Sequence, residues 1–135
     1  MSESQKIHVF SINDKLFLRE NNEKVGYFKQ IIQGFKLKYN NEVLKISEKT
    51  IGDRVLITID NNSYLIRKYE ITTWPDKKVK FHLKILNGTL RILDHDKKAI
   101  SKIFSSSDIK SIEILKKVPN FNFILFLSLQ SLLKE

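Results

Sequence analysis

The stretch VPNFNFILFLSLQSLLKE, from Val118 to Glu135, decides what kind of fold this chain can adopt. Its thirteen residues from Phe121 to Leu133 carry no charge, although the protein of 135 residues has a formal net charge of +9. Such a segment can be a membrane anchor, an aggregation-prone strand or an element buried inside the fold. A helix that spans a bilayer needs about 20 apolar residues, whereas a run of about 10 to 14 is more typical of a core helix. The length therefore favours a buried element.

The side chains of this segment have no polar side when they are placed on a helix. At about 100° per residue, the apolar side chains point in all directions, and the polar ones share no face. A helix that is apolar all round must be buried all round. A strand is compatible with the composition, but the length and the many leucines favour a helix, and Pro119 and Asn120 supply a start signal. We expect a core helix over about residues 120–133.

The rest of the chain predicts an antiparallel meander. Asn21-Asn22, Asn40-Asn41 and Asn61-Asn62 each separate two short runs that are rich in aromatic and β-branched residues. Asparagine tolerates positive φ and bonds its own backbone, which suits it to hairpin turns. The alternating runs predict about ten strands over about residues 7–115. In this interpretation Tyr64–Ile71 is a single strand.

The strands and the helix together predict a mostly β fold. We expect one domain over residues 1–135, a closed antiparallel barrel of about 10–12 strands around a central apolar C-terminal helix. Closure also removes the edge strands that would invite aggregation. The alternative is a pleckstrin-homology-like barrel, which has fewer strands and a C-terminal helix that caps one end. Such a cap should be amphipathic, and the scattered polar residues of the segment argue against it.

The stretch LFLRENNEKVGYFKQIIQGFKLKYNNEVLKISEK, from Leu16 to Lys49, resembles the repeated strand–turn–strand pattern of tubby-like proteins. That superfamily includes the LURP-one-related proteins and the phospholipid scramblases. The resemblance implies a roughly twelve-stranded barrel around a C-terminal apolar helix, which Phe121–Leu133 is similar to. It also implies a lipid-related function, because members include phosphoinositide binders and scramblases. It assigns no headgroup-binding residue of this chain.

Composition and motifs give little support to an enzyme. The chain has no cysteine, which excludes disulfides, thiolate metal sites and cysteine nucleophiles. Phosphate loops and known nucleophile motifs are absent. Asp94-His95-Asp96 is the one histidine cluster with carboxylates, and a hairpin turn explains it better than a metal or acid–base site. We therefore assign no catalytic residue, no metal and no cofactor. A filled barrel would also leave no interior pocket for a small molecule.

The charge pattern is the best indication of function. In DKKVKFHLKIL, strand periodicity predicts that Val79, Phe81, Leu83 and Ile85 face the core while the alternate residues face outward. Similar outward bases occur on two other hairpins. The candidate anion- or lipid-binding residues are Lys77, Lys78, Lys80, His82, Lys84, Lys36, Lys38, Arg67 and Lys68. Lysines that only keep exposed strands soluble are the competing explanation.

We therefore expect a non-enzymatic binding module for an anionic membrane surface or phospholipid headgroup. A protein partner and nucleic acid are the alternatives. Nucleic acid is disfavoured because Phe35, Tyr39 and Phe81 share the inward parity, so that outward stacking platforms are not expected. The polar N-terminus MSESQKIHVF has no apolar core of a secretory signal, and the tail is too short to span a bilayer. We expect a cytoplasmic protein without a transmembrane segment that associates peripherally with membranes.

Overall fold

A computed structural model of the chain describes residues 5–87, 89–106 and 109–133. The first four residues of the N-terminal stretch and the last two of the C-terminal stretch lie outside the described part. The described residues form twelve strands and one helix, namely β1 (Gln5–Ile12), β2 (Lys15–Glu20), β3 (Glu23–Ile31), β4 (Gly34–Tyr39), β5 (Glu42–Ile51), β6 (Arg54–Ile59), β7 (Asn62–Arg67), β8 (Glu70–Trp74), β9 (Lys80–Leu86), β10 (Thr89–Leu93), β11 (Ala99–Ser105), β12 (Lys110–Ile114) and α1 (Phe121–Leu133).

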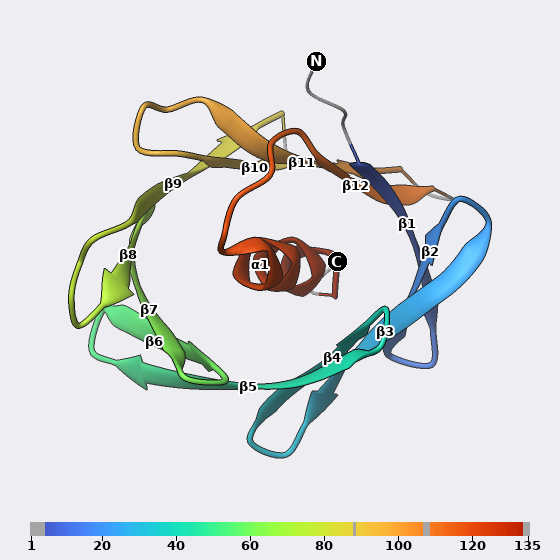
Figure 1. Ribbon diagram of the computed structural model, residues 1–135, viewed down its shortest axis with the longest axis horizontal. Helices are drawn as coiled ribbons and strands as arrows, with labels where there is room; N and C mark the ends of the chain where they lie inside the picture. The colour runs from blue at the N-terminus through green and yellow to red at the C-terminus, as the bar shows by residue number, and fades with distance from the viewer. Residues whose placement is uncertain (1–4, 88, 107–108, 134–135) are drawn as a thin grey trace.

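The strands form a closed barrel in which each strand pairs with its neighbours in the chain and β1 pairs with β12. Figure 1 looks along the barrel and shows α1 in its centre. The predicted antiparallel barrel around an apolar helix is therefore confirmed. The pleckstrin-homology-like alternative is wrong, because the helix lies inside the ring of strands and does not cap it.

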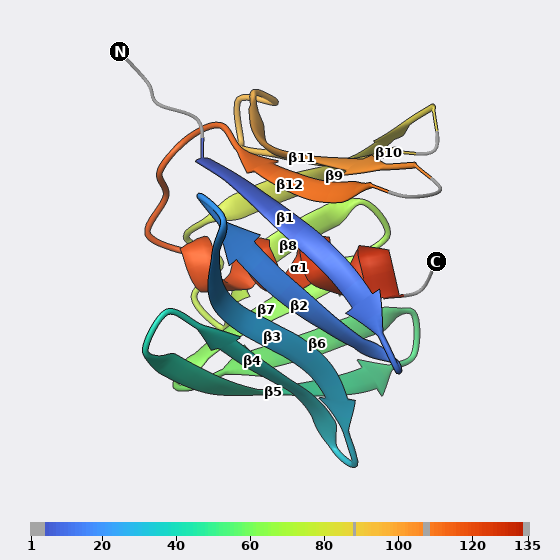
Figure 2. The same ribbon diagram turned by 90° about the vertical axis from the view of Figure 1, so that its right-hand side faces the viewer.

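The hairpin turns alternate between the two ends of the barrel. Six turns lie at the end of the barrel where α1 finishes, which we call the C-terminal end (Figure 2). They connect β1–β2, β3–β4, β5–β6, β7–β8, β9–β10 and β11–β12. The other end carries Asn21, Asn22 and Asn40, which adopt positive φ of 54°, 65° and 56°, and we call it the asparagine end. Asparagine is one of the few residues that enter this region readily.

One hairpin differs from the sequence prediction. Tyr64–Ile71 is not a single strand, because β7 ends at Arg67 and β8 begins at Glu70. Lys68 makes the turn in the left-handed region, at φ 56°. The tight turn has no Asn, Asp or Gly to mark it, and its one sign in the sequence is that the inward positions change from Tyr64 and Ile66 to Ile71. This hairpin accounts for part of the difference between about ten predicted strands and twelve observed ones.

The core lies between α1 and the inner face of the barrel. The ring of Phe126 meets Phe28 of β3 and Phe35 of β4, with centroids 5.8 and 5.3 Å away. On the other side of the helix, the ring of Phe123 stacks on Tyr64 of β7 at 3.8 Å. The buried residues of α1 are Phe123, Ile124, Leu125, Phe126, Leu127, Ser128, Leu129 and Leu132. Burial all round the axis agrees with the apolar pattern of the segment.

Candidate functional site

The predicted basic row on β9 is only partly a strand face. Lys80, His82 and Lys84 face outward, on the opposite side from the buried Phe81. Lys77 and Lys78 lie in the β8–β9 connection, where the Lys78 amide donates to the Thr73 hydroxyl at 2.9 Å. These two lysines therefore do not continue the row.

The expectation that Val79 and Ile85 face the core is wrong. Val79 precedes β9, and Ile85 is 60% exposed although it shares the parity of Phe81. Ile85 lies next to the β9–β10 turn, at the open end of the barrel, where alternation no longer buries a side chain. The position of a residue along a strand predicts which face of the sheet its side chain lies on. The side chain is buried only where another part of the protein covers that face.

Acidic residues of β8 and of the β5–β6 turn form ion pairs with some of the bases on this side of the barrel. The Lys80 ammonium lies 3.3 Å from the Glu70 carboxylate of β8, and His82 is opposite the same Glu70 in the register. The Arg67 guanidinium lies 3.4 Å from the Asp53 carboxylate. We call this face the paired wall, formed by the outward residues Arg54, Arg67, Glu70, Lys80 and His82.

The remaining predicted residues are spread around the barrel. Lys68 is the turn residue between β7 and β8. Lys84 lies opposite Arg91 of β10, and Arg91 lies opposite Lys102 of β11, so that these three bases form a short row of their own. Lys36 and Lys38 face outward from β4, which is separated from β9 by four strands in the barrel order. The structure therefore does not bring the nine predicted residues into one site.

Lys36 belongs instead to a group that the sequence prediction did not assemble. In the register of the barrel, Lys15 of β2 lies opposite Lys29 of β3, Lys29 opposite Lys36 of β4, and Lys36 opposite Lys45 of β5. Adjacent strands are about 4.8 Å apart, so that this lysine ladder spans about 14 Å. Like charges directly opposite each other on a sheet are destabilising. The four lysines therefore form a concentrated positive site in which neighbouring ammonium groups repel one another.

A β-bulge sets the register of the ladder. The two-residue turn at Asn21-Asn22 pairs Arg19 with Lys24, but the next pair joins Leu18 to Gly26, so that Val25 is an extra residue. A shift of one residue moves every following side chain to the other face of the strand. The bulge is therefore what turns Phe28 toward α1 and places Tyr27 and Lys29 on the outer surface.

Outward aromatic side chains lie next to the ladder. Phe10 of β1 is opposite Phe17 of β2, and Phe17 is opposite Tyr27 of β3. The Arg19 guanidinium lies 5.8 Å from the Phe10 ring centroid, and the Lys15 ammonium lies 5.9 Å from that of Tyr27. The expectation that no outward aromatics alternate with bases is therefore wrong, even though Phe35, Tyr39 and Phe81 do point inward as expected.

A surface hollow of about 450 Å³ lies at one side of these rings, lined by Phe10, Ile12, Phe17, Arg19 and Lys24. It combines two aromatic rings and an aliphatic side chain with two cations. The signal for the outward rings was present in the sequence, because Phe17 alternates with Leu16 and Leu18, which are both buried. A cation that is held above a ring face gains a modest attraction and keeps its charge exposed to a ligand.

The acids of the same strands do not reach this surface. Glu42 and Glu48 of β5 lie on the inward parity and accept hydrogen bonds from Asn122 and Gln130 of α1, at 3.0 and 2.6 Å. Glu20 of β2 accepts from the Gln5 amide and from the Tyr39 hydroxyl at the asparagine end. None of the outward positions within β1 to β5 is acidic. We call this face the basic wall, whose bases are Lys6, Lys15, Arg19, Lys24, Lys29, Lys36, Lys38, Lys45 and Lys49.

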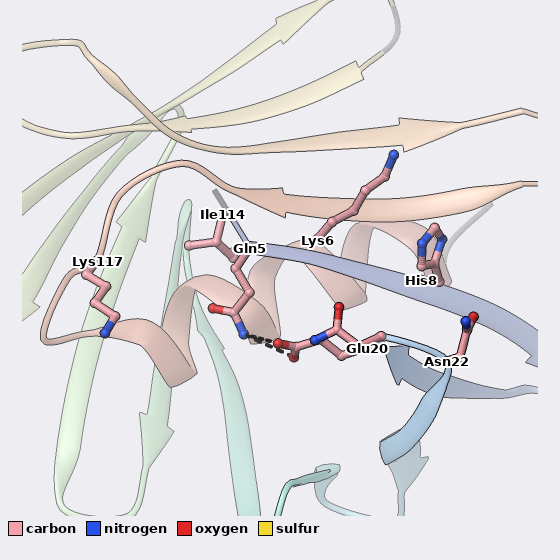
Figure 3. Close-up of a pocket in the computed structure, with 8 residues that line it drawn as sticks. Gln5, Lys6, His8, Glu20, Asn22, Ile114 and Lys117 are labelled. Atoms are coloured by element: carbon pink, nitrogen blue, oxygen red, sulfur yellow. Dashed lines mark hydrogen bonds between the residues drawn. The ribbon is translucent and has the colours of Figure 1, made fainter. Parts of the chain in front are cut away.

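A second hollow, of about 580 Å³, opens at the asparagine end beside the start of the basic wall. Figure 3 shows Lys6, His8 and Lys117 around its edge, with Gln5 and Glu20 directed toward each other. Burial and the neighbouring Glu20 carboxylate raise the pKa of the Tyr39 hydroxyl well above its ordinary value of 10. The Glu20 carboxylate therefore already accepts hydrogen bonds from two neutral donors, and it connects β1, β2 and β4 at the asparagine end of the barrel.

Asp94-His95-Asp96 forms the turn between β10 and β11. The Asp94 carboxylate accepts hydrogen bonds from the Asp96 and Lys98 amides, each at 2.9 Å, and from the Lys116 ammonium at 2.9 Å. The Lys98 amide and the Lys116 ammonium hold the pKa of this carboxyl below its usual value. Within the described residues, no group of three or more His, Asp or Glu side chains has the arrangement of a metal site.

Comparisons of the chain with protein-family models, curated proteins and solved structures find no match. The tubby-like family assignment stays a prediction from the sequence. In the part of the chain that the structure describes, no helix has both the length and the apolar character needed to cross a membrane.

Proposed function

We propose that this chain is a non-enzymatic binding module for anionic membrane surfaces, and that the basic wall holds the phospholipid headgroups. The observation that carries the proposal is the lysine ladder of Lys15, Lys29, Lys36 and Lys45 on a face whose outward positions are free of acids. Lysines that serve solubility alone do not need to face one another. A row of phosphates would relieve their mutual repulsion and contribute about 1 kcal/mol per basic residue close to the membrane.

The aromatic part of the wall supports the same ligand. Phe10, Ile12 and Val43 are about half exposed, and they lie among the bases of the wall. Aromatic and aliphatic side chains beside lysines are typical of a surface that meets the interfacial region of a bilayer. A tubby-like membership and a cytoplasmic location with peripheral membrane association are parts of this proposal, since phosphoinositide binders belong to that superfamily.

Single-stranded nucleic acid is the second candidate, because Phe17 and Tyr27 alternate with bases as stacking platforms do. It ranks lower because Arg19 and Lys15 already occupy positions over Phe10 and Tyr27. Ile12 and Val43 also offer no face on which a base can stack. A protein partner is the third possibility, and no particular observation on the basic wall favours it.

The test is co-sedimentation with vesicles that contain an anionic phospholipid, at low and high salt. Lys15→Glu, Lys29→Glu and Lys36→Glu together should weaken binding by about 100-fold or more, since each base contributes about 1 kcal/mol. The parent protein should also lose binding as salt rises, because the attraction is screened. Circular dichroism of the triple variant should show that the barrel is intact.

The matched control is Lys77→Glu, Lys78→Glu and Lys80→Glu, which makes the same change in net charge outside the basic wall and near the asparagine end. This variant should keep most of its affinity for the vesicles. An equal loss in both variants would mean that net charge alone attracts the protein to the membrane. Binding to a short single-stranded oligonucleotide in preference to the vesicles would promote the second candidate.

A further inference from the structure

The two ends of the barrel differ in their exposed apolar residues. At the C-terminal end, each of the six hairpins carries an exposed large apolar side chain, namely Ile12, Ile32, Ile51, Tyr69, Leu86 and Ile109. Ile32 is fully exposed in the β3–β4 turn. At the asparagine end, among the described residues, the exposed large apolar side chains are Val43, Trp74 and Val79. We call the six residues at the C-terminal end the apolar rim.

A base accompanies every member of the apolar rim within three positions along the chain. These bases are Lys15, Lys29, Lys49, Lys68, Lys84 and Lys110. Four acids of the described part of the chain lie near the same end: Asp53 and Glu70 form ion pairs with Arg67 and Lys80, Glu48 accepts a hydrogen bond from Gln130, and Asp14 lies in the β1–β2 turn. The rim therefore combines apolar tips with positive charge behind them.

We propose that the apolar rim inserts into the interface of an anionic bilayer, so that the barrel docks with its C-terminal end toward the membrane. This inference rests on the proposed function and adds the orientation in which the membrane is bound. The first members of the lysine ladder, Lys15 and Lys29, lie beside the tips Ile12 and Ile32. They reach phosphates while the tips enter the region between the headgroups.

A bilayer fits this arrangement better than a folded partner does. The six side chains stand on separate hairpins around the exit of α1, and Figure 2 shows these hairpins at the same end of the barrel as the helix terminus. A hollow of about 620 Å³ beside Ile32 has a largely polar lining, with Gln30, Gln33, Glu48, Thr50 and Gln130, and no other member of the rim lines it. A lipid interface accepts separate apolar side chains, and the long lysine side chains can extend their charged ends toward the headgroups.

The structure supplies an internal reference for the test. Trp74 is the single tryptophan of the chain and lies at the asparagine end, away from the rim. In the native protein its fluorescence should not change when vesicles with an anionic phospholipid are added. In a variant with Ile32→Trp and Trp74→Phe, the emission should shift to the blue and be quenched by brominated acyl chains.

Affinity provides the second measurement. Ile32→Ser should weaken vesicle binding by roughly tenfold, because it removes an apolar side chain that would be buried in the interface. Val79→Ser, an exposed aliphatic residue at the other end, should leave the affinity unchanged. Neither variant should unfold, since both side chains are exposed.

The outcomes separate this inference from the proposed function. A parent protein that binds no anionic vesicles contradicts both. Vesicle binding that depends on the lysine ladder, with no fluorescence change at position 32 and no effect of Ile32→Ser, overturns the docking orientation and keeps the function. Environment changes at Trp74 in place of position 32 also overturn it. Sedimentation that shows a dimer abolished by Ile32→Ser would assign the rim to a second copy of the chain.

Discussion

The basic wall and the paired wall are built from similar hairpins, and both direct lysine or arginine side chains outward. They differ in what lies opposite each base. On the paired wall, Lys80 lies 3.3 Å from Glu70 and Arg67 lies 3.4 Å from Asp53. On the basic wall, Lys36 lies between Lys29 and Lys45. The two walls therefore differ in their local charge balance: acids lie beside bases on the paired wall, whereas none of the outward positions within β1 to β5 is acidic.

The difference also shows how the interior affects the exterior. The acids of β5 are used on the inner side, where Glu42 and Glu48 bond to polar residues near the two ends of α1. These two hydrogen bonds lie at exposed positions near the ends of the helix, on the inward parity of β5. An acid that serves the helix cannot neutralise a lysine outside. The alternation along β5 thus directs its glutamates toward α1 and its lysines toward the basic wall.

The largest expected difference between the two walls is in stability, and it comes from the aromatic contacts of α1. Phe126 packs against Phe28 and Phe35 under the basic wall, and Phe123 packs against Tyr64 and Phe81 under the paired wall. Phe126→Ala and Phe123→Ala should each cost about 3–5 kcal/mol of unfolding free energy. Hydrogen exchange of the folded variants should show the loss of protection in β3–β4 for the first and in β7–β9 for the second.

Vesicle binding should follow the same division. Phe126→Ala should weaken binding, because it loosens the strands that align the ladder, while Phe123→Ala should have little effect at a temperature where both variants are folded. A uniform loss of protection in both variants would mean that α1 supports the barrel as one unit. The walls could then not be compared separately.

Sequence reasoning reached the architecture because the deciding features are local. The apolar run Phe121–Leu133 has a definite length and no polar face, and the period of two persists along most strands. The turn at Lys68 escaped detection because no residue type marks it. The strand alternation also identified most inward residues, such as Phe35, Leu37 and Phe81, which are buried.

The candidate site was less predictable, because it depends on pairs across strands. Lys15 and Lys45 are thirty positions apart, and only the register places them in one row. The bulge at Val25 shifts that register by one residue, and its one mark in the sequence is Gly26, an isolated glycine inside a strand. For the same reason, the row on β9 looked free of acids along the chain, although Glu70 lies beside it in the sheet.

A smaller difference between the walls is expected in the unfolding free energy at high pH. Burial and Glu20 raise the pKa of Tyr39 under the basic wall, and burial raises that of Tyr64 under the paired wall, where Asn120 partly opposes the shift. A pKa that is higher in the folded state gives stability that is complete below the unfolded value of 10 and is lost as pH rises above it. The unfolding free energy should therefore fall above about pH 10.

The two tyrosines should contribute unequally to this alkaline loss. Ionisation of Tyr39 would bring a second negative charge next to Glu20, whereas Tyr64 accepts a hydrogen bond from the Asn120 amide at 2.7 Å. Tyr39→Phe should flatten the pH dependence more than Tyr64→Phe, as measured by urea unfolding at several pH values. Lysine deprotonation is common to both variants and cancels in the comparison. Equal flattening would contradict the role of Glu20.

The smallest effect tests the charges themselves, and its sign should differ between the walls. Lys36→Gln removes a lysine that faces two others, so that the unfolding free energy should rise by about 0.2–1 kcal/mol at low salt. Lys80→Gln removes the partner of Glu70 and should lower it by about 0.2–1 kcal/mol. Urea unfolding measures both values, and the identical chemical change gives each variant the other as its control. In about 1 M salt both differences should shrink, because screening acts over about 3 Å.

The opposite signs have a direct consequence for function. If Lys36→Gln stabilises the barrel and also weakens vesicle binding, the ladder is maintained at a cost in stability, and ligand binding is the physical reason that accounts for it. If Lys36→Gln destabilises the barrel as Lys80→Gln does, the lysines of the ladder have partners on the outer surface. The basic wall would then be a second paired wall, and the argument for an anionic ligand would lose its main support.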